Sequence, residues 1–358
     1  MTATPVLTAA TPTIEVKGEP SGLLGASLED LVVTETLEGL ATCEARFRNV
    51  GAGNGDPDYL FFDGDVLDFG VDVRISTGAG EGTALVFSGN VTGLRAEFSG
   101  RNGATLTMLA EDRLQDLRMT RRTRSFEDMT DAAAFEQIAS DHRLRAEIDL
   151  PGPTYRVIAQ VDQSDLAFLR TRARRAGAEV WVRDDTLHVA ARTTRRGERV
   201  VLGNQQNLLE ASLFADLAAQ RTEVQVHGWD PSTKERLDER ATGDVVKAEA
   251  SGDKVGPDVL ERAFGRRVET IAHQVPLGPD EARALAKSQM LERARRFVTG
   301  EILAVGDARI AVGGTVDLSG VGAPFSGVYY VVEARHLFDL VGGYRTLAKV
   351  ERGELTAT

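Results

Sequence analysis

The chain has 358 residues, which is enough for two or three domains. Acidic residues outnumber basic ones by 54 to 42, giving a net charge of -12. Because phosphate affinity comes from Lys and Arg, this balance argues against a dedicated binder of nucleic acid or anionic membranes. A lone Cys43 excludes an internal disulfide and a cysteine zinc cage.

No run approaches the ~18 apolar residues that span a membrane, so no membrane-spanning segment is expected. The first residues, "MTATPVLTAATPTIEV", have neither a basic leader nor a continuous apolar core, and therefore do not resemble a secretory signal. We therefore expect a protein that is made and folded in the cytoplasm.

From Thr13 to Asp112 the sequence predicts mostly strands. The candidate strands are short and rich in Val, Leu, Phe and Thr, with turns rich in Gly, Asn and Asp between them: "IEVKG", "LVVTETL", "ATCEARFRN", "VLDFGVDVRIS", "ALVFSGNVTGLRAEF" and "ATLTMLAED". In the third of these, Cys43 falls on the same face as Ala45 and Phe47, which indicates a small buried side chain. Many short strands with glycine turns are typical of a barrel or a sandwich.

The middle of the chain, 113–202, changes character. A helix is predicted to start near Thr130. A second helix follows, with Asp162 or Ser164 as its cap, and Gly177 is expected to end it. "AEVWV" and "TLHVA" then read as a hairpin joined by "RDD".

After Gln205 the strands return in "LLEASLFADL", "RTEVQVHGWD" and "RIAVGGTVDL". One long helix is predicted at about 279–298, because Pro279 suits a first turn and an apolar stripe runs along it. The polar segment 232–258 reads as a mobile or lightly ordered excursion.

The two strand-rich regions echo each other. "GDVLDFGVDV", "FSGNVTGLRAEF" and "GATLTMLAED" match "GGTVDLSGVG", "FSGVYYVVEARHLF" and "GYRTLAKVER" in order and residue class, although chance resemblance between generic strands is the alternative. The predicted fold is mainly β: two related, tube-like β-barrel domains at 1–115 and 205–358, with an α/β insert at 116–204. Three such chains around an axis would present six similar units.

No catalytic, cofactor-binding or metal site is expected, and no cofactor. The histidines show neither a His-x-x-x-His pair nor a nearby cysteine: His142, His188, His227, His273 and His336. "GAGNG" and "GAGEGTAL" lack the ending of a phosphate-binding loop and read as turns. The acids of "DPDYLFFDGDVLDFG" match no EF-hand spacing, and those of Asp184 and Asp185 are expected to close a turn.

Arginines are concentrated in and after the second predicted helix: Arg170, Arg172, Arg174, Arg175, Arg192, Arg195, Arg196 and Arg199. Because adjacent helix positions point about 100° apart, those on the helix make no single stripe. Three interpretations stay open: salt bridges on a solvated surface, a protein contact in an assembly, or a nucleic-acid contact.

Several of these segments resemble the late control protein D family, the baseplate hub proteins of contractile phage tails, and the N-terminal half of VgrG proteins of type VI secretion. The resemblance rests on "QVDQSDLAFLRTRARRAGAEVWVRDDTLHV", "RTRSFEDMTDAAAFEQIASDHRL", "VQVHGWDPSTKERL" and the closing strands up to "AKVERG". None of these is a catalytic motif, so they indicate fold and assembly rather than an enzyme. VgrG chains continue into a spike after this point, whereas "GELTAT" holds no repeat, so the phage arrangement with a separate spike chain is expected.

The resemblance implies a homotrimer with pseudo-six-fold symmetry, seated between a hexameric inner tube and a trimeric spike. Its implied partners are tube or tube-initiator proteins, the spike and baseplate wedge proteins, and nucleic acid is not an expected specific ligand. Assembly is expected in the bacterial cytoplasm, as part of a phage-tail-like particle. Two other functions stay open: a free-standing carbohydrate- or receptor-binding β module, and a cell-wall hydrolase.

Overall fold

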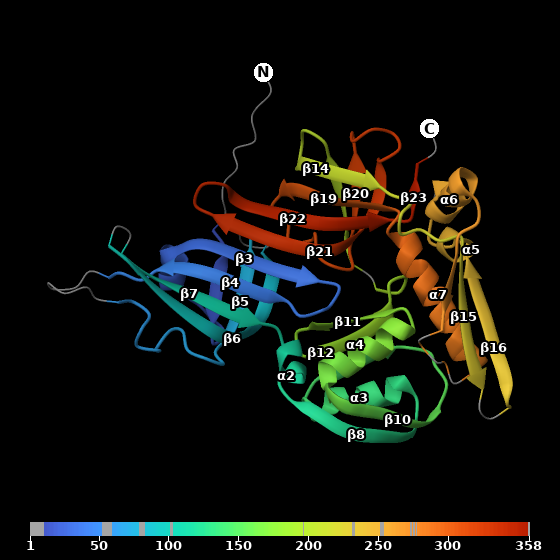
Figure 1. Cartoon of the computed structure of the whole chain (residues 1–358). Helices are drawn as coiled ribbons and strands as arrows, with labels where there is room; N and C mark the ends of the chain where they lie inside the picture. The colour runs from blue at the N-terminus through green and yellow to red at the C-terminus, as the bar shows by residue number, and fades with distance from the viewer. Residues whose placement is uncertain are drawn as a thin grey trace.

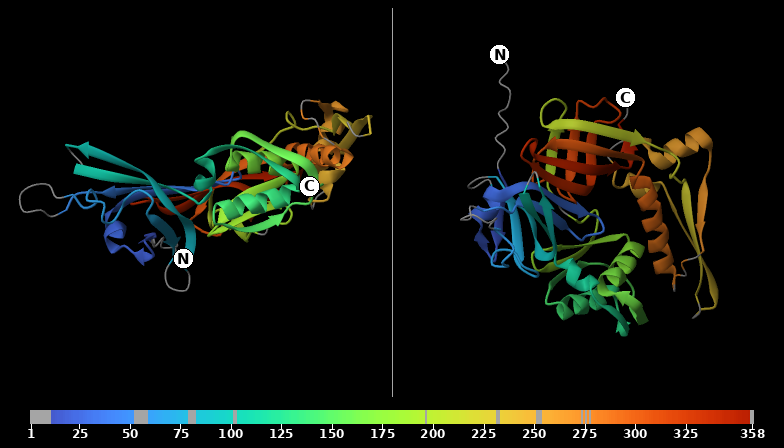
Figure 2. Two further views of the ribbon diagram at one scale, coloured as in Figure 1. Left: turned by 90° about the horizontal axis from the view of Figure 1, so that it is seen from below. Right: turned by 60° about the vertical axis from the view of Figure 1, so that its left-hand side comes forward.

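The computed structural model describes residues 11–51, 59–78, 83–100, 103–195, 197–230, 233–250, 254–272, 274, 276 and 278–356. Two strand-rich regions lie side by side, a mixed α/β region lies below them, and a helix with a long hairpin forms an arm beside it (Figure 1). Figure 2 shows the same arrangement from below and after a sideways turn. The molecule is mainly β with several short helices and one long one.

The first β region contains all six strands that the sequence predicts. Its elements are β1 (Thr13–Val16), β2 (Glu19–Pro20), α1 (Gly22–Ser27), β3 (Leu28–Thr36), β4 (Thr42–Arg48), β5 (Asp72–Thr77), β6 (Ala84–Ser99) and β7 (Gly103–Glu111). Helix α1 was not predicted; the Ser21 hydroxyl caps it by accepting the Leu24 amide.

The middle region contains both predicted helices and the predicted hairpin. Its elements are α2 (Leu114–Arg118), β8 (Arg121–Met129), α3 (Asp131–Asp141), β9 (Arg145–Asp149), β10 (Tyr155–Ser164), α4 (Asp165–Arg175), β11 (Ala178–Arg183) and β12 (Thr186–Ala191). Thr130 caps α3, and Ser164 rather than Asp162 caps α4, because its hydroxyl accepts the Ala167 amide. Gly177, at φ +73°, follows the end of α4 as expected.

The remaining elements build the second β region and the arm. They are β13 (Arg199–Gly203), β14 (Leu208–Ala215), β15 (Glu223–Asp230), β16 (Glu235–Thr242), α5 (Asp244–Lys247), β17 (Lys254–Val255), α6 (Gly256–Phe264), β18 (Val268–Ile271), α7 (Pro279–Arg295), β19 (Val298–Val305), β20 (Thr315–Ser319), β21 (Gly327–Asp339), β22 (Gly343–Arg352) and β23 (Glu354–Leu355). Helix α7 ends three residues before the predicted end, because Val298 already starts β19.

The predicted excursion at 232–258 is wrong for the residues that the structure describes. Eight residues of it form β16, which pairs with β15 from Glu235 to Thr242. Leu237 and Ala241 of β16 are buried on the face that packs against α7. The segment reads as polar because the other face of this hairpin is exposed, and only the packing of α7 reveals its apolar side.

The same strand order occurs in both β regions. The first runs β3–β4–β7–β6–β5–β1, and the second runs β14–β19–β22–β21–β20–β13. The turn that precedes β5 in the first region and β20 in the second is also repeated. Gly70 and Gly313 both have positive φ, and their amides donate to the carbonyls of Val91 and Val331.

The irregularities of the two regions match as well. Single-residue register shifts occur at Leu28/Asp30 and Leu208/Glu210, and again at Val91/Gly93 and Val331/Glu333. Because β-bulges are specific features of a fold, their recurrence makes chance similarity a poor account of the echo. Three features differ. Phe87 lies within β6, whereas Phe325 precedes β21. The register shift at Ile75/Ser76 has no counterpart between β20 and β21, and β1 pairs antiparallel with β5 whereas β13 pairs parallel with β20.

The two β regions share one sheet. Residues Glu333–Asp339 of β21 pair antiparallel with Thr36–Asp30 of β3, so thirteen strands form one sheet. Eleven of them follow an open path from β14 to β2, and β20 and β13 branch from β21. This corrects the expectation of two separate barrels, since no closed ring of paired strands occurs in the described part of the chain. The pairing satisfies backbone groups that each region alone would leave at an exposed edge.

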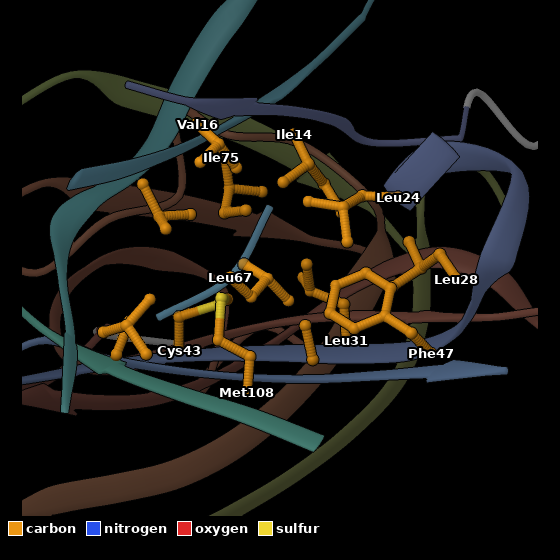
Figure 3. Close-up of a cluster of buried hydrophobic side chains, with 14 of the residues drawn as sticks. Ile14, Val16, Leu24, Leu28, Leu31, Cys43, Phe47, Leu67, Ile75 and Met108 are labelled. Atoms are coloured by element: carbon orange, nitrogen blue, oxygen red, sulfur yellow. The ribbon is translucent and has the colours of Figure 1, made fainter. Parts of the chain in front are cut away.

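The core of the first β region is closed by a side chain from the second. Its buried residues include Ile14, Cys43, Phe47 and Met108, drawn in Figure 3, and the cluster also contains Phe338 of β21. Cys43 is buried as predicted, and burial raises the pKa of its thiol to about 12. The core therefore extends across the junction between the regions.

His336 lies at the centre of this junction, opposite Val33. Its Nδ1 is 2.8 Å from the Tyr344 hydroxyl and 3.3 Å from that of Thr346. Burial lowers the pKa of His336 to about 4, so the ring is neutral in the folded protein.

We expect acid to weaken the fold through His336. An unfolded histidine titrates near 6.5, so between pH 6.5 and 4 the unfolded chain takes up a proton that the folded chain refuses, and stability falls as pH falls. His336→Asn removes this titration while keeping a polar group near Tyr344. Between pH 6.5 and 4, the free energy of unfolding of the unsubstituted protein should therefore fall by on the order of 2–3 kcal/mol more than that of the variant. Denaturant titration at each pH measures both. Parallel pH curves would contradict the assignment.

Candidate functional site

The arginine-rich tract forms ion pairs. Arg172 pairs with Asp131, Arg174 with Glu38 at 2.7 Å, and Arg199 with Asp317 at 2.6 Å: three partners from three parts of the chain. The interpretation as salt bridges is therefore confirmed for these residues. Arg196 lies outside the described residues.

The best-buried arginine of the tract is Arg195, whose side chain is 6% exposed. Its guanidinium lies 3.1 Å from Glu179 of β11 and 3.5 Å from Glu35 of β3, and donates to the Val312 carbonyl at 2.8 Å. It also lies over the Trp181 ring, 4.2 Å from its centre. One side chain thus contacts the first β region, the middle region and the second β region.

Arg192 joins the same cluster from the other side. It pairs with Glu351 of β22 at 2.5 Å and with Glu179 at 3.4 Å, and it lies 4.0 Å over the ring of Tyr330. The Tyr330 hydroxyl donates to Glu179 at 2.7 Å. Both oxygens of Glu179 are therefore engaged by three donors from outside its own strand.

Burial dominates the electrostatics of this junction cluster, which we define as Glu35, Glu179, Arg192, Arg195, Tyr330 and Glu351. Burial raises the pKa of Glu35, with Arg195 opposing it, and burial raises the pKa of Tyr330, with Glu179 adding to the effect. Burial alone would lower the pKa of Arg192, but the nearby carboxylates of Glu351 and Glu179 outweigh burial and raise this pKa. Because its acids are saturated by arginines and by a phenol, the cluster is built to hold elements together rather than to transfer protons to a substrate.

The sequence could not reveal the cluster. Glu35, Glu179 and Glu351 are more than 140 residues apart in sequence, and nothing in their spacing links them to Arg192. The density of arginines was the only signal, and it left salt bridges, a protein contact and a nucleic-acid contact open.

The histidines have structural contacts. His142 lies 2.8 Å from Asp165, His188 lies 3.1 Å from Glu147 and stacks on Trp181, and His227 lies 3.3 Å from Asp238. His273 falls outside the described residues. Among the residues that the structure describes, no three His, Cys, Asp or Glu side chains converge as a metal site would require.

The glycine-rich and acidic loops lie between strands. "GAGEGTAL" leads into β6 rather than a helix, although 79–82 fall outside the described residues, as do 52–58 of "GAGNGDPD". Asp184 and Asp185 form the turn between β11 and β12, as expected, and Asp185 accepts from Arg113 at 2.7 Å. Within the described ranges, no helix is both long and apolar enough to cross a membrane.

Glu179→Gln tests the weight of the junction cluster. The substitution removes the carboxylate that Arg192 and Arg195 share, although Glu351 and Glu35 remain as their partners. The loss of these charge-assisted hydrogen bonds in a buried place should lower the free energy of unfolding by about 2 kcal/mol. The matched control is Glu38→Gln, which removes an exposed pair with Arg174 and should cost no more than about 0.5 kcal/mol. Equal effects in urea unfolding would show that the cluster holds nothing together.

Several solved structures are similar to this chain. The 43 kDa tail protein of prophage MuSo2 from Shewanella oneidensis has a TM-score of 0.69 and 11% identity, covering 96% of this chain and 98% of that one. A tail protein from Neisseria meningitidis MC58 has a TM-score of 0.67 and 13% identity, covering 96% of each chain. The E. coli c3393 protein, a type VI secretion component with structural similarity to the T4 tail proteins gp27 and gp5, has a TM-score of 0.59 and 10% identity, covering 96% of this chain and 79% of that one.

These identities are low, so the likeness is one of fold. It extends over nearly the whole chain and confirms the resemblance to phage tail and injection-system proteins that the sequence indicated. No curated protein sequence matches the chain. The family model described as the Alg8 N-terminal domain matches residues 14–339, and the chain therefore belongs to the Alg8 N-terminal domain family, with the fold of phage tail proteins.

Proposed function

We propose that this chain is the structural baseplate hub of a contractile tail or injection system. The observation that carries the proposal is the repeat: one chain contains two six-strand units of the same order, joined edge to edge in one sheet. The fold shared with phage tail proteins supports a role in a tail-like particle.

Three copies of the chain would place six similar units around an axis. A trimer of this kind matches a six-fold inner tube on one face and a three-fold spike on the other. Its work is mechanical: to seat the spike, to template the first ring of the tube, and to bear the load between them. Tube or tube-initiator proteins, the spike and baseplate wedge proteins are the partners that this role requires.

The proposed division of the chain is 1–115, 116–204 and 205–358. Its support is that the middle region has a core of its own, built from α3, α4 and the sheets around them. The two outer units form the ring, and the middle region packs outside their junction, where the junction cluster attaches it. This arrangement needs no enzyme activity, and the engaged acids of the cluster favour a non-catalytic role.

Native mass spectrometry and negative-stain imaging test the proposal. We expect a particle of three 38.6 kDa chains, seen as a ring with six similar lobes and an axial opening. A co-expressed spike should add three chains of its own. A protein that stays monomeric at micromolar concentration, with no ring in the images, would rule out the hub assignment.

A further inference from the structure

The edges of the sheet in the described part of the chain include β2, β13 and two longer exposed segments. One is β14, whose ladder partner is β19 on one side only. The other is Gly93–Phe98 of β6, which pairs with β7 on one side. Both segments are largely exposed along their length, and each presents a large apolar side chain: Phe98 is 67% exposed and Phe214 is 63% exposed. Such edges are usually covered or paired in native proteins.

The internal repeat identifies these two segments. By strand order and by the position of its bulge, β14 is the counterpart of β3, and β6 is the counterpart of β21. Within the chain, β3 and the second half of β21 pair with each other to make the junction between the regions. Their counterparts are the two exposed edges, and they lie far apart along the sheet of one chain.

Phe98 shows the same relation at the level of one side chain. Phe98 is the counterpart of Phe338, because Phe338 lies two residues after His336 and Phe98 lies two residues after the equivalent position of β6. Phe98 pairs with Ala104 on β7, as Phe338 pairs with Tyr344 on β22. Phe338 is 4% exposed because it enters the core of the other β region across the junction. Phe98 contacts Tyr59 and Phe62, with ring centres 5.9 and 5.8 Å away, but stays mostly exposed.

We propose that β14 of one subunit pairs antiparallel with Gly93–Phe98 of β6 in the next subunit, repeating between chains the junction that β3 and β21 make within one. This inference names the subunit interface of the proposed hub and rests on that function. Transferring the register of the internal junction places Phe98 opposite Ala211 and Glu97 opposite Ser212. In a ring, internal and intersubunit junctions then alternate, and the edges of β14 and of Gly93–Phe98 are both paired.

The facing side chains fit this register. Ala211 is exposed on the edge strand and small, so the ring of Phe98 can pass over it toward the core of the second β region. Leu213 and Ala215, on the same face of β14, already pack against that core. Phe98 would therefore enter an apolar environment, as Phe338 does in the internal junction.

An engineered disulfide tests the register. Glu97→Cys and Ser212→Cys in one chain place two exposed thiols opposite each other only between subunits, so mild oxidation should give covalent trimers on a non-reducing gel. Glu97→Cys with Asp216→Cys, four residues or about 13 Å out of register, is the matched control and should give none. Cys43 does not interfere, because it is buried and its raised pKa keeps the thiol protonated.

A second variant tests the anchor. Phe98→Asp should convert the trimer to monomers at low micromolar concentration. The circular dichroism spectrum should stay that of the folded chain, because within one chain the substitution removes only the ring contacts of an exposed side chain with Tyr59 and Phe62. Phe69→Asp is the matched control: Phe69 is 65% exposed on another segment and its loss should leave the trimer intact.

The two proposals fail in different ways. A trimer that resists Phe98→Asp, or in which the Glu97/Ser212 pair does not cross-link, refutes this interface and leaves the hub assignment standing. An unsubstituted chain that is monomeric by native mass refutes both.

Discussion

The antiparallel pairing of β21 with β3 is the constraint on which the rest of this structure depends. It joins segments about 300 residues apart in sequence through a ladder of seven residue pairs. Backbone amides and carbonyls buried without partners would cost several kcal/mol in total, so the two β regions cannot separate without exposing an edge on each. Phe338 extends the constraint to side chains, because a residue of the second region fills the core of the first.

The junction cluster serves the same junction from the side of the middle region. Arg195 reaches Glu35 on β3, Glu179 on β11 and the Val312 carbonyl, so its position is defined only when all three regions are assembled. A buried ionic network of this kind adds little net stability over a well-packed apolar one. Its contribution is directional: the charges and the two ring contacts of Arg192 and Arg195 fix how the middle region sits against the sheet.

The repeat connects this internal architecture to assembly. The two units share more than their strand order, because two β-bulges and one glycine turn also recur. The chain thus contains one complete junction and two exposed edges that are the counterparts of its strands. Exposed side chains such as Phe98 and Phe214 are costly on a monomer and are expected at a subunit interface, so the proposed hub role and the proposed interface support each other.

The sequence by itself determined the features that depend on neighbours in the chain. Alternation predicted the six strands of the first region, Ser164 and Gly177 limited α4, and Pro279 marked the start of α7. These signals are local, because caps, turns and periodicity act over a few residues. Even the repeat was visible, since both copies preserve the order of their strands.

Only the tertiary structure decided the features that depend on distant partners. It showed that 235–242 is a strand covered by α7 rather than a loose excursion, that β21 leaves β20 to pair with β3, and that the arginine tract meets Glu35, Glu179 and Glu351. The sequence of an edge strand does not indicate which other edge strand it will pair with. Likewise, the sequence around a charged residue does not indicate which opposite charge it will contact. Those choices are made by packing between segments that only folding brings together.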